Sequence, residues 1–137
     1  MDNNNEYKVS IIVPTYNHQK YIVDCLNGIF KQSIKFNCQL IIGDDSSLDN
    51  TRELIETFLE NHNHDSIDVE LVFHERNLST QRLPGKFNFL SLANLSKGDY
   101  SILCEGDDYW TDPLKLQSQV DFLDSHEGYS MCFHNVA

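Results

Sequence analysis

Carboxylates gather at two places in the chain, each directly after a short apolar run. The first is GDDSSLDNT (residues 43–51) and the second is EGDDYW (residues 105–110). Like charges packed this closely repel one another, and the repulsion costs free energy unless a cation or a hydrogen-bonding ligand offsets it. Hard carboxylate oxygens suit Mg²⁺ or Mn²⁺. Both clusters therefore indicate a cation or a polar ligand.

The second cluster offers two separate carboxylates on a short turn. Asp107 and Asp108 are consecutive, so their side chains diverge on a turn and can serve two different groups. Gly106 allows the backbone to approach closely or to take a positive φ. The alternative is a solvent-exposed acidic turn, with Asp112 capping the helix that follows. The turn taken alone leaves both interpretations open.

The first cluster mixes acids with good helix-capping residues. Asp44 or Asp45 could accept a hydrogen bond from a nucleobase or a ribose, whereas the residues that follow are typical of helix N-caps. We expect both roles to be filled. Asp49 and Asn50 would serve as caps, with Glu53 completing a capping pair with Asn50, and Asp45 would remain for a ligand.

Cations are few, and three of the ten lie in or beside one long segment, HERNLSTQRLPGK (residues 74–86). They are Arg76, Arg82 and Lys86. A loop of this length is uncommon in a compact domain unless it serves a function, although each charge could simply be solvated. No G-x-S-x-G, P-loop or G-x-G-x-x-G motif occurs, and the histidines lack a metal-ligand spacing.

The elements that position these clusters alternate between strand and helix. Alternation of this kind implies an α/β fold, a three-layer α/β/α sandwich around a mostly parallel sheet. Ligands bind at the carboxyl ends of the strands in such sheets, and PTYNH, GDDSS and EGDD each follow a predicted strand. We predict strands at 9–16 (stopped by Pro14), 38–43, 67–73 (half-exposed), 100–104 and 129–137, and helices from about 19, from about 50, over 86–96 (capped by Gly98) and from Pro113.

The composition of the chain limits the classes of function that it can have. A chain of 137 residues with 40% hydrophobic residues fits one globular domain. The net charge of −11 argues against nucleic acid or an anionic membrane surface as the partner, because both need a basic face. No apolar run is long enough to cross a bilayer, and the four scattered cysteines suit a reducing compartment. We expect a cytoplasmic protein without a membrane segment.

Three stretches together resemble a known family. VSIIVPTYNHQKYIVDCLNGIFKQ, LIIGDDSSLDNT and KGDYSILCEGDDYWTDPLKLQSQVDFL are similar to the nucleotide-sugar-binding half of glycosyltransferase family 2, which has the GT-A fold, a Rossmann-like fold of nucleotide-diphospho-sugar transferases. The likeness runs from Val9 to about Val136. Its three motifs occur in the family's order, each at a strand end, so together they are more specific than any one alone.

The resemblance implies a nucleotide site. Pro14, Thr15 and Tyr16 would flank the base, Asp45 would hydrogen-bond it, and the base would be uracil. Asp107 would contact the ribose.

The resemblance also implies a metal, Mn²⁺ or Mg²⁺, bridging the diphosphate. Asp108 would be a ligand. Glu105 stands where many members have the first Asp of a D-x-D motif, so it is a second candidate ligand. Arg82, or in second place Lys86, would be the loop cation near the nucleotide.

The implied reaction is metal-dependent transfer of a sugar, with inversion, from a nucleotide-diphosphate donor to the hydroxyl of a saccharide or lipid-linked acceptor. The family's general base lies beyond the position of Ala137. We therefore expect residues 1–137 to be a single donor-binding domain of a longer enzyme, inactive alone. A catalytically silent nucleotide-binding module is the alternative. A nucleotidyltransferase would need a Gly-rich loop where PTYNHQ stands, and a receiver domain would need its acids after the first strand.

Overall fold

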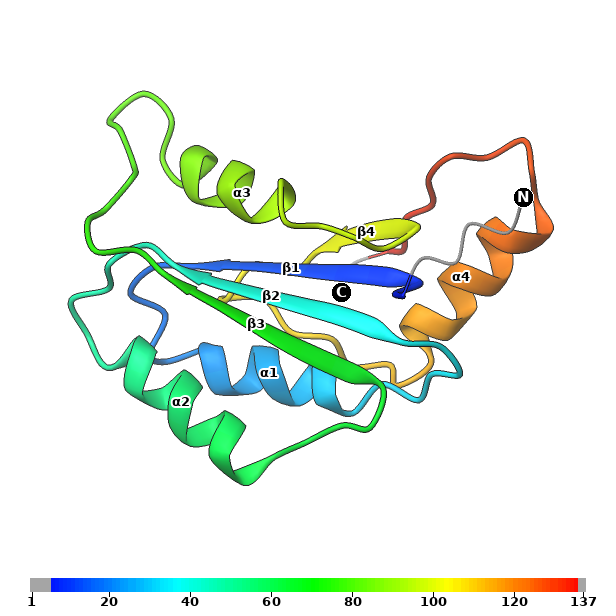
Figure 1. The fold of residues 1–137 in the computed structure, drawn as a ribbon, viewed down its shortest axis with the longest axis horizontal. Helices are drawn as coiled ribbons and strands as arrows, with labels where there is room; N and C mark the ends of the chain where they lie inside the picture. The colour runs from blue at the N-terminus through cyan, green and yellow to red at the C-terminus, as the bar shows by residue number, and fades with distance from the viewer. Residues whose placement is uncertain (1–5, 136–137) are drawn as a thin grey trace.

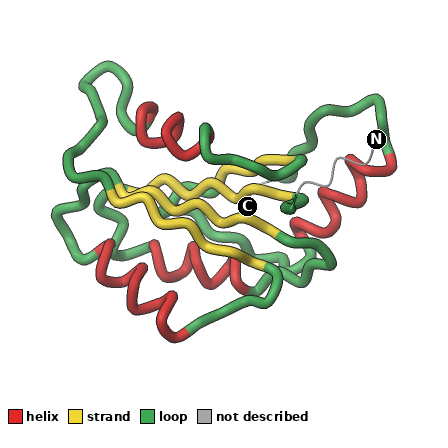
Figure 2. The backbone as a smooth tube through the Cα atoms, viewed as in Figure 1, coloured by secondary structure: helices red, strands yellow, loops and turns green. Residues whose placement is uncertain are grey.

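The computed structural model describes residues 6–135. Four strands within this range form one parallel sheet in the order β3-β2-β1-β4 (Figure 1). Helices connect the strands, as the tube in Figure 2 shows. The strands are β1 (Val9–Thr15), β2 (Cys38–Asp44), β3 (Ile67–Phe73) and β4 (Tyr100–Leu103). The helices are α1 (Ile22–Phe30), α2 (Thr51–Asn61), α3 (Lys86–Ala93) and α4 (Lys115–Ser125).

The sheet has apolar side chains on both faces, and helices cover both. Along β1, Ile11 and Val13 pack into a large cluster with side chains of α1, α2 and α4, whereas Ile12 between them packs with Leu92 of α3. Figure 1 shows α1 and α2 on one side of the sheet and α3 on the other. Successive side chains of a strand point to opposite faces, so a strand that is apolar throughout needs cover on both. The three-layer prediction is confirmed.

Pro14 does not end the first strand, contrary to expectation. β1 continues through Pro14 to Thr15. The carbonyl of Pro14 accepts a hydrogen bond from Gly106 N–H at 3.0 Å, so its backbone polar groups face β4. β4 has already ended at Leu103, which pairs with Ile12. The missing N–H of proline therefore removes no ladder hydrogen bond.

Three other expectations fail near the C-terminal half. Helix α3 ends at Ala93 with Asn94 as its cap, and Gly98 instead donates its N–H to the Ser10 hydroxyl at 2.9 Å. α4 begins at Lys115 rather than at Pro113. The last predicted strand is not formed over residues 129–135, which add no strand to the sheet; residues 136–137 lie outside the described part of the chain.

The fold brings the three polar motifs to one edge of the sheet. In the register of the sheet, Thr15 pairs with Asp44. Beyond the ladder, Asp45 N–H donates to the Thr15 carbonyl at 3.0 Å. The segments that follow β1, β2 and β4 therefore leave the sheet side by side, as the topology predicted. Within residues 6–135, no helix combines the length and the apolar character needed to cross a bilayer.

Candidate functional site

A cavity of about 460 Å³ opens at this carboxyl edge. Its walls come from the ends of β1 and β4, from the segments after β1, β2 and β4, from the long loop that precedes α3 and from α3 itself. The lining residues are Pro14, Thr15, Tyr16, His18, Asp45, Ser79, Pro84, Gly85, Lys86, Asn88, Phe89, Leu103 and Glu105. Asp45 and Glu105, which are remote in sequence, thus border one space.

The predicted site residues divide into those in the cavity wall and those beside it. Pro14, Thr15, Tyr16, Asp45 and Glu105 are in the wall.

Asp107 and Asp108 lie outside the wall, exposed on the turn that follows Glu105, where Asp108 N–H donates to the Glu105 carbonyl at 2.9 Å. The cavity wall contains Lys86 and not the exposed Arg82.

The Asp45 carboxylate is fastened to the long loop. Its Oδ1 accepts the Leu78 N–H at 2.6 Å, and its Oδ2 accepts the Ser79 hydroxyl at 2.9 Å. The Asn77 amide also donates to the Asp45 carbonyl at 2.9 Å. A carboxylate offers about four lone-pair sites, so acceptor capacity remains. Asp45 is only 1% exposed, and the contacts with Leu78 and Ser79 help to cover its carboxylate.

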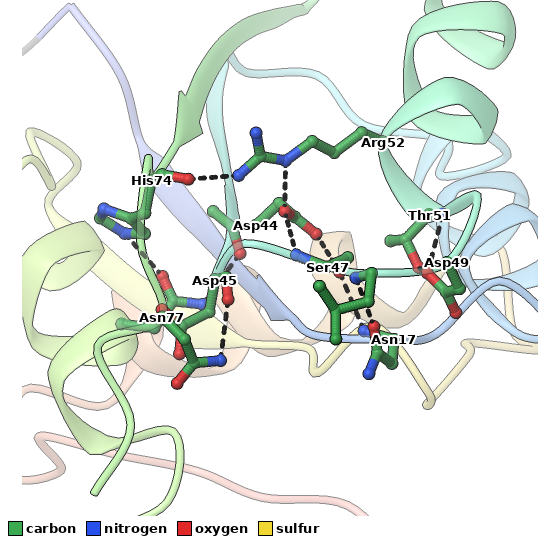
Figure 3. A network of polar contacts seen from close by, with 12 residues as sticks. Asn17, Asp44, Asp45, Ser47, Asp49, Thr51, Arg52, His74 and Asn77 are labelled. Carbon is green, nitrogen blue, oxygen red and sulfur yellow. Dashed lines mark hydrogen bonds and ion pairs between the residues drawn. The ribbon is translucent and has the colours of Figure 1, made fainter.

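The neighbouring acid, Asp44, is occupied entirely by the protein (Figure 3). It is 0% exposed, and its Oδ2 accepts hydrogen bonds from Arg52 Nε at 2.5 Å and Ser47 N–H at 2.9 Å. Arg52 also donates through Nη2 to the His74 carbonyl and lies 5.0 Å from the centre of the Phe73 ring. Asp44 thus ties β2 to α2 and to the end of β3. Sequence reasoning did not find this role of Arg52.

The capping prediction is partly wrong. Asn50 occupies the N-cap position of α2 but makes no side-chain capping hydrogen bond. Asp49 does the capping instead, since its Oδ1 accepts from Thr51 N–H at 3.0 Å and from the Thr51 hydroxyl at 2.5 Å. This leaves Asp45, and not the residues after it, facing the cavity.

The loops after β1 and β2 are joined side to side. Asn17, at a φ of 53°, donates its N–H to the Ser47 hydroxyl at 2.9 Å and accepts the Leu48 N–H at 2.8 Å. His18 N–H donates to the Thr51 hydroxyl at 2.9 Å. These contacts, drawn in part in Figure 3, hold the PTYNH and GDDSS segments in a fixed mutual position.

The acidic turn rests on the end of β1. A Cβ added at Gly106 would lie 2.6 Å from Thr15 Oγ1 and 2.8 Å from His18 Nδ1. Glycine is therefore required at this position because the turn approaches Thr15 and His18 closely. A positive φ is not the reason, since among the glycines of residues 6–135 only Gly85 has one. His18 lies between the cavity and the turn. Its position directly after PTYN in the sequence could have indicated this placement.

The donor atoms at the turn fit a hard divalent cation. Among residues 6–135, no group of three or more His, Cys, Asp or Glu side chains is arranged to hold a metal ion. Magnesium, however, typically binds through one or two carboxylates together with waters and substrate phosphates. Glu105 in the cavity wall and the exposed Asp108 beside it match that requirement.

The buried cysteines belong to the core rather than to the site. Cys25, Cys38 and Cys104 are buried free thiols. A hydrogen bond with Cys104, together with burial, raises the pKa of Cys25 far above its ordinary range, and burial raises the pKa of Cys38 to about 12. Neutral thiols of this kind pack as small apolar groups and are poor metal ligands.

Comparison with known proteins gives a consistent result. The family model of glycosyl transferase family 2 matches residues 10–136. The uncharacterized protein Rv1520 of Mycobacterium tuberculosis is 36% identical over 128 residues, which are 93% of this chain and 35% of that protein. The poly(ribitol-phosphate) beta-N-acetylglucosaminyltransferase TarS of Staphylococcus aureus is 30% identical over 120 residues, 87% of this chain and 19% of TarS.

Solved structures of TarS have the same fold. The crystal structure of TarS 1–349 from S. aureus in complex with UDP-GlcNAc superposes with a TM-score of 0.73 at 28% identity, covering 88% of this chain and 32% of that one. A complex of the same protein with UDP gives a TM-score of 0.73 at 26% identity, over 88% and 33% of the two chains. This chain therefore spans about a third or less of the length of these relatives.

Proposed function

This chain belongs to glycosyl transferase family 2, and from that premise we propose that it is the donor-binding part of an enzyme that transfers a sugar from a UDP-sugar to an acceptor hydroxyl. One observation carries the proposal: Asp45 and Glu105, on separate strand ends, border the same cavity at the carboxyl edge of a parallel sheet. Nucleotide ligands bind at this edge in open α/β sheets. The UDP and UDP-GlcNAc complexes of TarS support the choice of base.

The nucleoside would occupy the cavity. In this proposal Pro14, Thr15 and Tyr16 flank the base, and Asp45 accepts a hydrogen bond from the uracil N–H. Asp107, on the adjacent turn, contacts the ribose. The loop segment at Leu78 and Ser79 must move for the base to reach Asp45, since the hydrogen bonds from Leu78 and Ser79 cover the buried carboxylate.

The diphosphate would lie toward the acidic turn. Asp108 and Glu105 would hold Mn²⁺ or Mg²⁺, and such an ion, when bound, stabilises negative charge on a departing nucleoside diphosphate. Lys86 in the cavity wall, or Arg82 on the loop before it, adds positive charge near the nucleotide. An anion entering a protein of net charge −11 needs such neutralisation.

The remainder of the reaction would require residues outside this chain. We place the general base, which deprotonates the attacking hydroxyl in an inverting transfer, beyond Ala137, together with the surface for a saccharide or lipid-linked acceptor. Residues 1–137 then bind nucleotide and transfer no sugar alone. Incubation with UDP-GlcNAc and simple acceptors tests this, and sugar transfer by the isolated chain would contradict it.

Calorimetric titration with the diphosphates of uridine, guanosine, adenosine and thymidine, each with and without Mn²⁺, tests the nucleotide site. We expect UDP to bind tightest, with an affinity that Mn²⁺ raises. Asp45→Ala should weaken UDP about 10-fold or more, the cost of a lost hydrogen bond to a charged group. Asp65→Ala is the control, since Asp65 is exposed at the opposite end of the strands. Equal affinity for all four would remove base recognition, and no binding would refute the proposal.

A catalytically silent binding module is the alternative function, and the titration alone does not separate it from an enzyme. Such a module would bind UDP in its full-length form without consuming UDP-sugar. The full-length protein should instead release UDP from its donor when an acceptor is present, and this measurement separates the two functions.

A further inference from the structure

We propose that His18 is a positioning residue that holds the Asp107 carboxylate in place at the edge of the cavity, an inference that rests on the proposed nucleotide site. His18 is the histidine in the wall of that cavity. It comes from the segment after β1, whereas Asp107 comes from the turn after β4. The imidazole thus links the two segments that would meet at the nucleoside.

The backbone of His18 is fixed at both of its polar groups. Its N–H donates to the Thr51 hydroxyl at 2.9 Å, and its carbonyl accepts the N–H groups of Tyr21 and Ile22, each at 2.9 Å. The latter bonds lie at the start of α1. The Cα of His18 therefore has little freedom, and only rotation of the side chain could move the ring.

One nitrogen of the ring is held by a hydrogen bond, and the other faces Asp107. Nδ1 lies 3.0 Å from Thr15 Oγ1, and Nε2 lies 3.9 Å from Asp107 Oδ2. An ionised carboxylate only accepts hydrogen bonds, so a proton on Nε2, facing Asp107, is the favoured arrangement, with Nδ1 accepting from the Thr15 hydroxyl. The His18 side chain is 21% exposed, which limits competition from water.

The turn that carries Asp107 is packed onto this pair. A Cβ at Gly106 would meet both Thr15 Oγ1 at 2.6 Å and His18 Nδ1 at 2.8 Å, so the turn sits directly on the two side chains. The Asp107 side chain is 46% exposed, and its Oδ2 lies 3.9 Å from the Nε2 of His18. In this inference the contact with His18, and not the turn alone, sets the orientation of Asp107.

Two substitutions test the contributions of the two ring nitrogens separately. Asn at position 18 can place its amide near the site of Nδ1 and retain the contact with Thr15, but it is too short to face Asp107. Gln can place an N–H near the site of Nε2 and lose the contact with Thr15. If His18 acts through Asp107, His18→Gln should preserve the effect and His18→Asn should remove it.

The measurement is how well the protein discriminates between UDP and its deoxy analogues. Two ratios of affinity express this, UDP over 2′-deoxy-UDP and UDP over 3′-deoxy-UDP. We expect Asp107→Ala to reduce the larger of these two ratios about 10-fold, and His18→Asn to reduce it by a similar factor. The double variant should lose little more, because residues that act as one unit are not additive. A merely structural effect would weaken UDP and its deoxy analogues equally.

The outcomes distinguish this inference from the proposed function. If the wild-type chain binds no UDP, the proposed function fails. If it binds UDP and His18→Asn leaves the ribose ratio unchanged, or if the losses in the double variant add, the positioning role is refuted. Should His18→Asn not fold by circular dichroism, His18→Leu decides, since it fills the space of the ring without an N–H to face Asp107; an unchanged ribose ratio in that variant would also refute the role.

Discussion

The hydroxyl of Ser79 donates to the carboxylate of Asp45 at 2.9 Å, joining the end of β2 to the long loop before α3. In the proposed site this hydroxyl competes with the base for a carboxylate oxygen. Ser79→Ala should therefore strengthen UDP binding, by up to about 10-fold for a hydrogen bond to a charged group worth about 1.5 kcal/mol. Calorimetry with UDP measures the change.

Ser118→Ala provides the matched control for this prediction, because Ser118 is an exposed serine on α4. Amide hydrogen exchange gives a second measurement. Residues 77–85 should change their exchange rates when UDP is added, whereas the strands should not. Weaker UDP binding in Ser79→Ala would mean that the loop contact supports the site rather than competing with the ligand.

Substitution of Asp108 should abolish the dependence of UDP binding on metal. Asp108→Asn removes the charge while keeping the shape, so the affinities with Mn²⁺ and with a chelator should become equal. Glu105→Gln should only reduce the metal effect, since Asp108, the principal ligand in this proposal, would remain. Glu127→Gln, which alters an exposed acid near the end of α4, is the control. A metal effect of wild-type size in Asp108→Asn would exclude Asp108 as a ligand.

Removal of Arg52 should destabilise the fold strongly. Arg52→Ala would leave the carboxylate of Asp44, which is 0% exposed, without its cation. The Arg52 side chain is 34% exposed, so the cost should lie near the lower end of the roughly 3–5 kcal/mol for breaking a fully buried pair. Urea denaturation gives the free energy of unfolding, and Arg76→Ala, at an exposed loop arginine, should change it by less than about 0.5 kcal/mol. A loss below about 1 kcal/mol for Arg52→Ala would show that water replaces the guanidinium.

The ion pair between Lys8 and Asp124 should make a small, pH-dependent contribution. The hydrogen bond from Lys8, at 2.9 Å, lowers the pKa of Asp124 below its ordinary value of 3.8. A carboxyl whose pKa is lower in the folded state stabilises the fold above pH 3.8, and this contribution is lost as the pH falls through the folded pKa. The Asp124 side chain is 45% exposed, so solvent screening keeps it below about 1 kcal/mol.

The variant Asp124→Asn measures this contribution. Its melting temperature should lie slightly below that of the wild type at pH 7, and the difference should shrink as the pH falls below 3.8 and vanish below the folded pKa of Asp124. High salt should also shrink the difference at pH 7. A difference that persists in acid would point to packing rather than charge. Asp65→Asn, at an exposed loop acid, should show no difference at any pH.

Much of the architecture could be predicted because it depends on local patterns. Continuous apolar runs separated by amphipathic segments require a parallel sheet covered on both faces. The second strand, expected at 38–43, spans Cys38–Asp44. Pro14 was misjudged, because its effect depends on where the neighbouring strand ends, and Gly98 was misjudged, because its contact with Ser10 is made across the sheet. Neither relationship is visible in a local window.

The site was predictable in its location but not in its contacts. The carboxyl ends of parallel strands share an edge, so the motifs had to meet there. The partners of the acids could not be predicted from the sequence: Arg52 pairs with Asp44, Ser79 donates to Asp45 and His18 faces Asp107. Each of these contacts joins different segments of the chain, and side-chain chemistry alone does not select one partner among several polar candidates.

The close packing of Gly106 against the end of β1 gives the sharpest test of the whole site. Gly106→Ala would bring a Cβ within 2.6 Å of Thr15 Oγ1 and 2.8 Å of His18 Nδ1, so the acidic turn must move. Overpacking of this kind costs about 1–3 kcal/mol of stability. The displaced turn should also weaken UDP binding, since it carries Glu105 and Asp107.

Gly128→Ala is the matched control, because a Cβ at Gly128 meets nothing within 4 Å. Its free energy of unfolding and its UDP affinity should equal those of the wild type. If Gly106→Ala is destabilised but binds UDP and Mn²⁺ with unchanged affinity, the turn cannot be part of the nucleotide site, because a ligand bridging Asp45 and the turn must sense a shift in their separation.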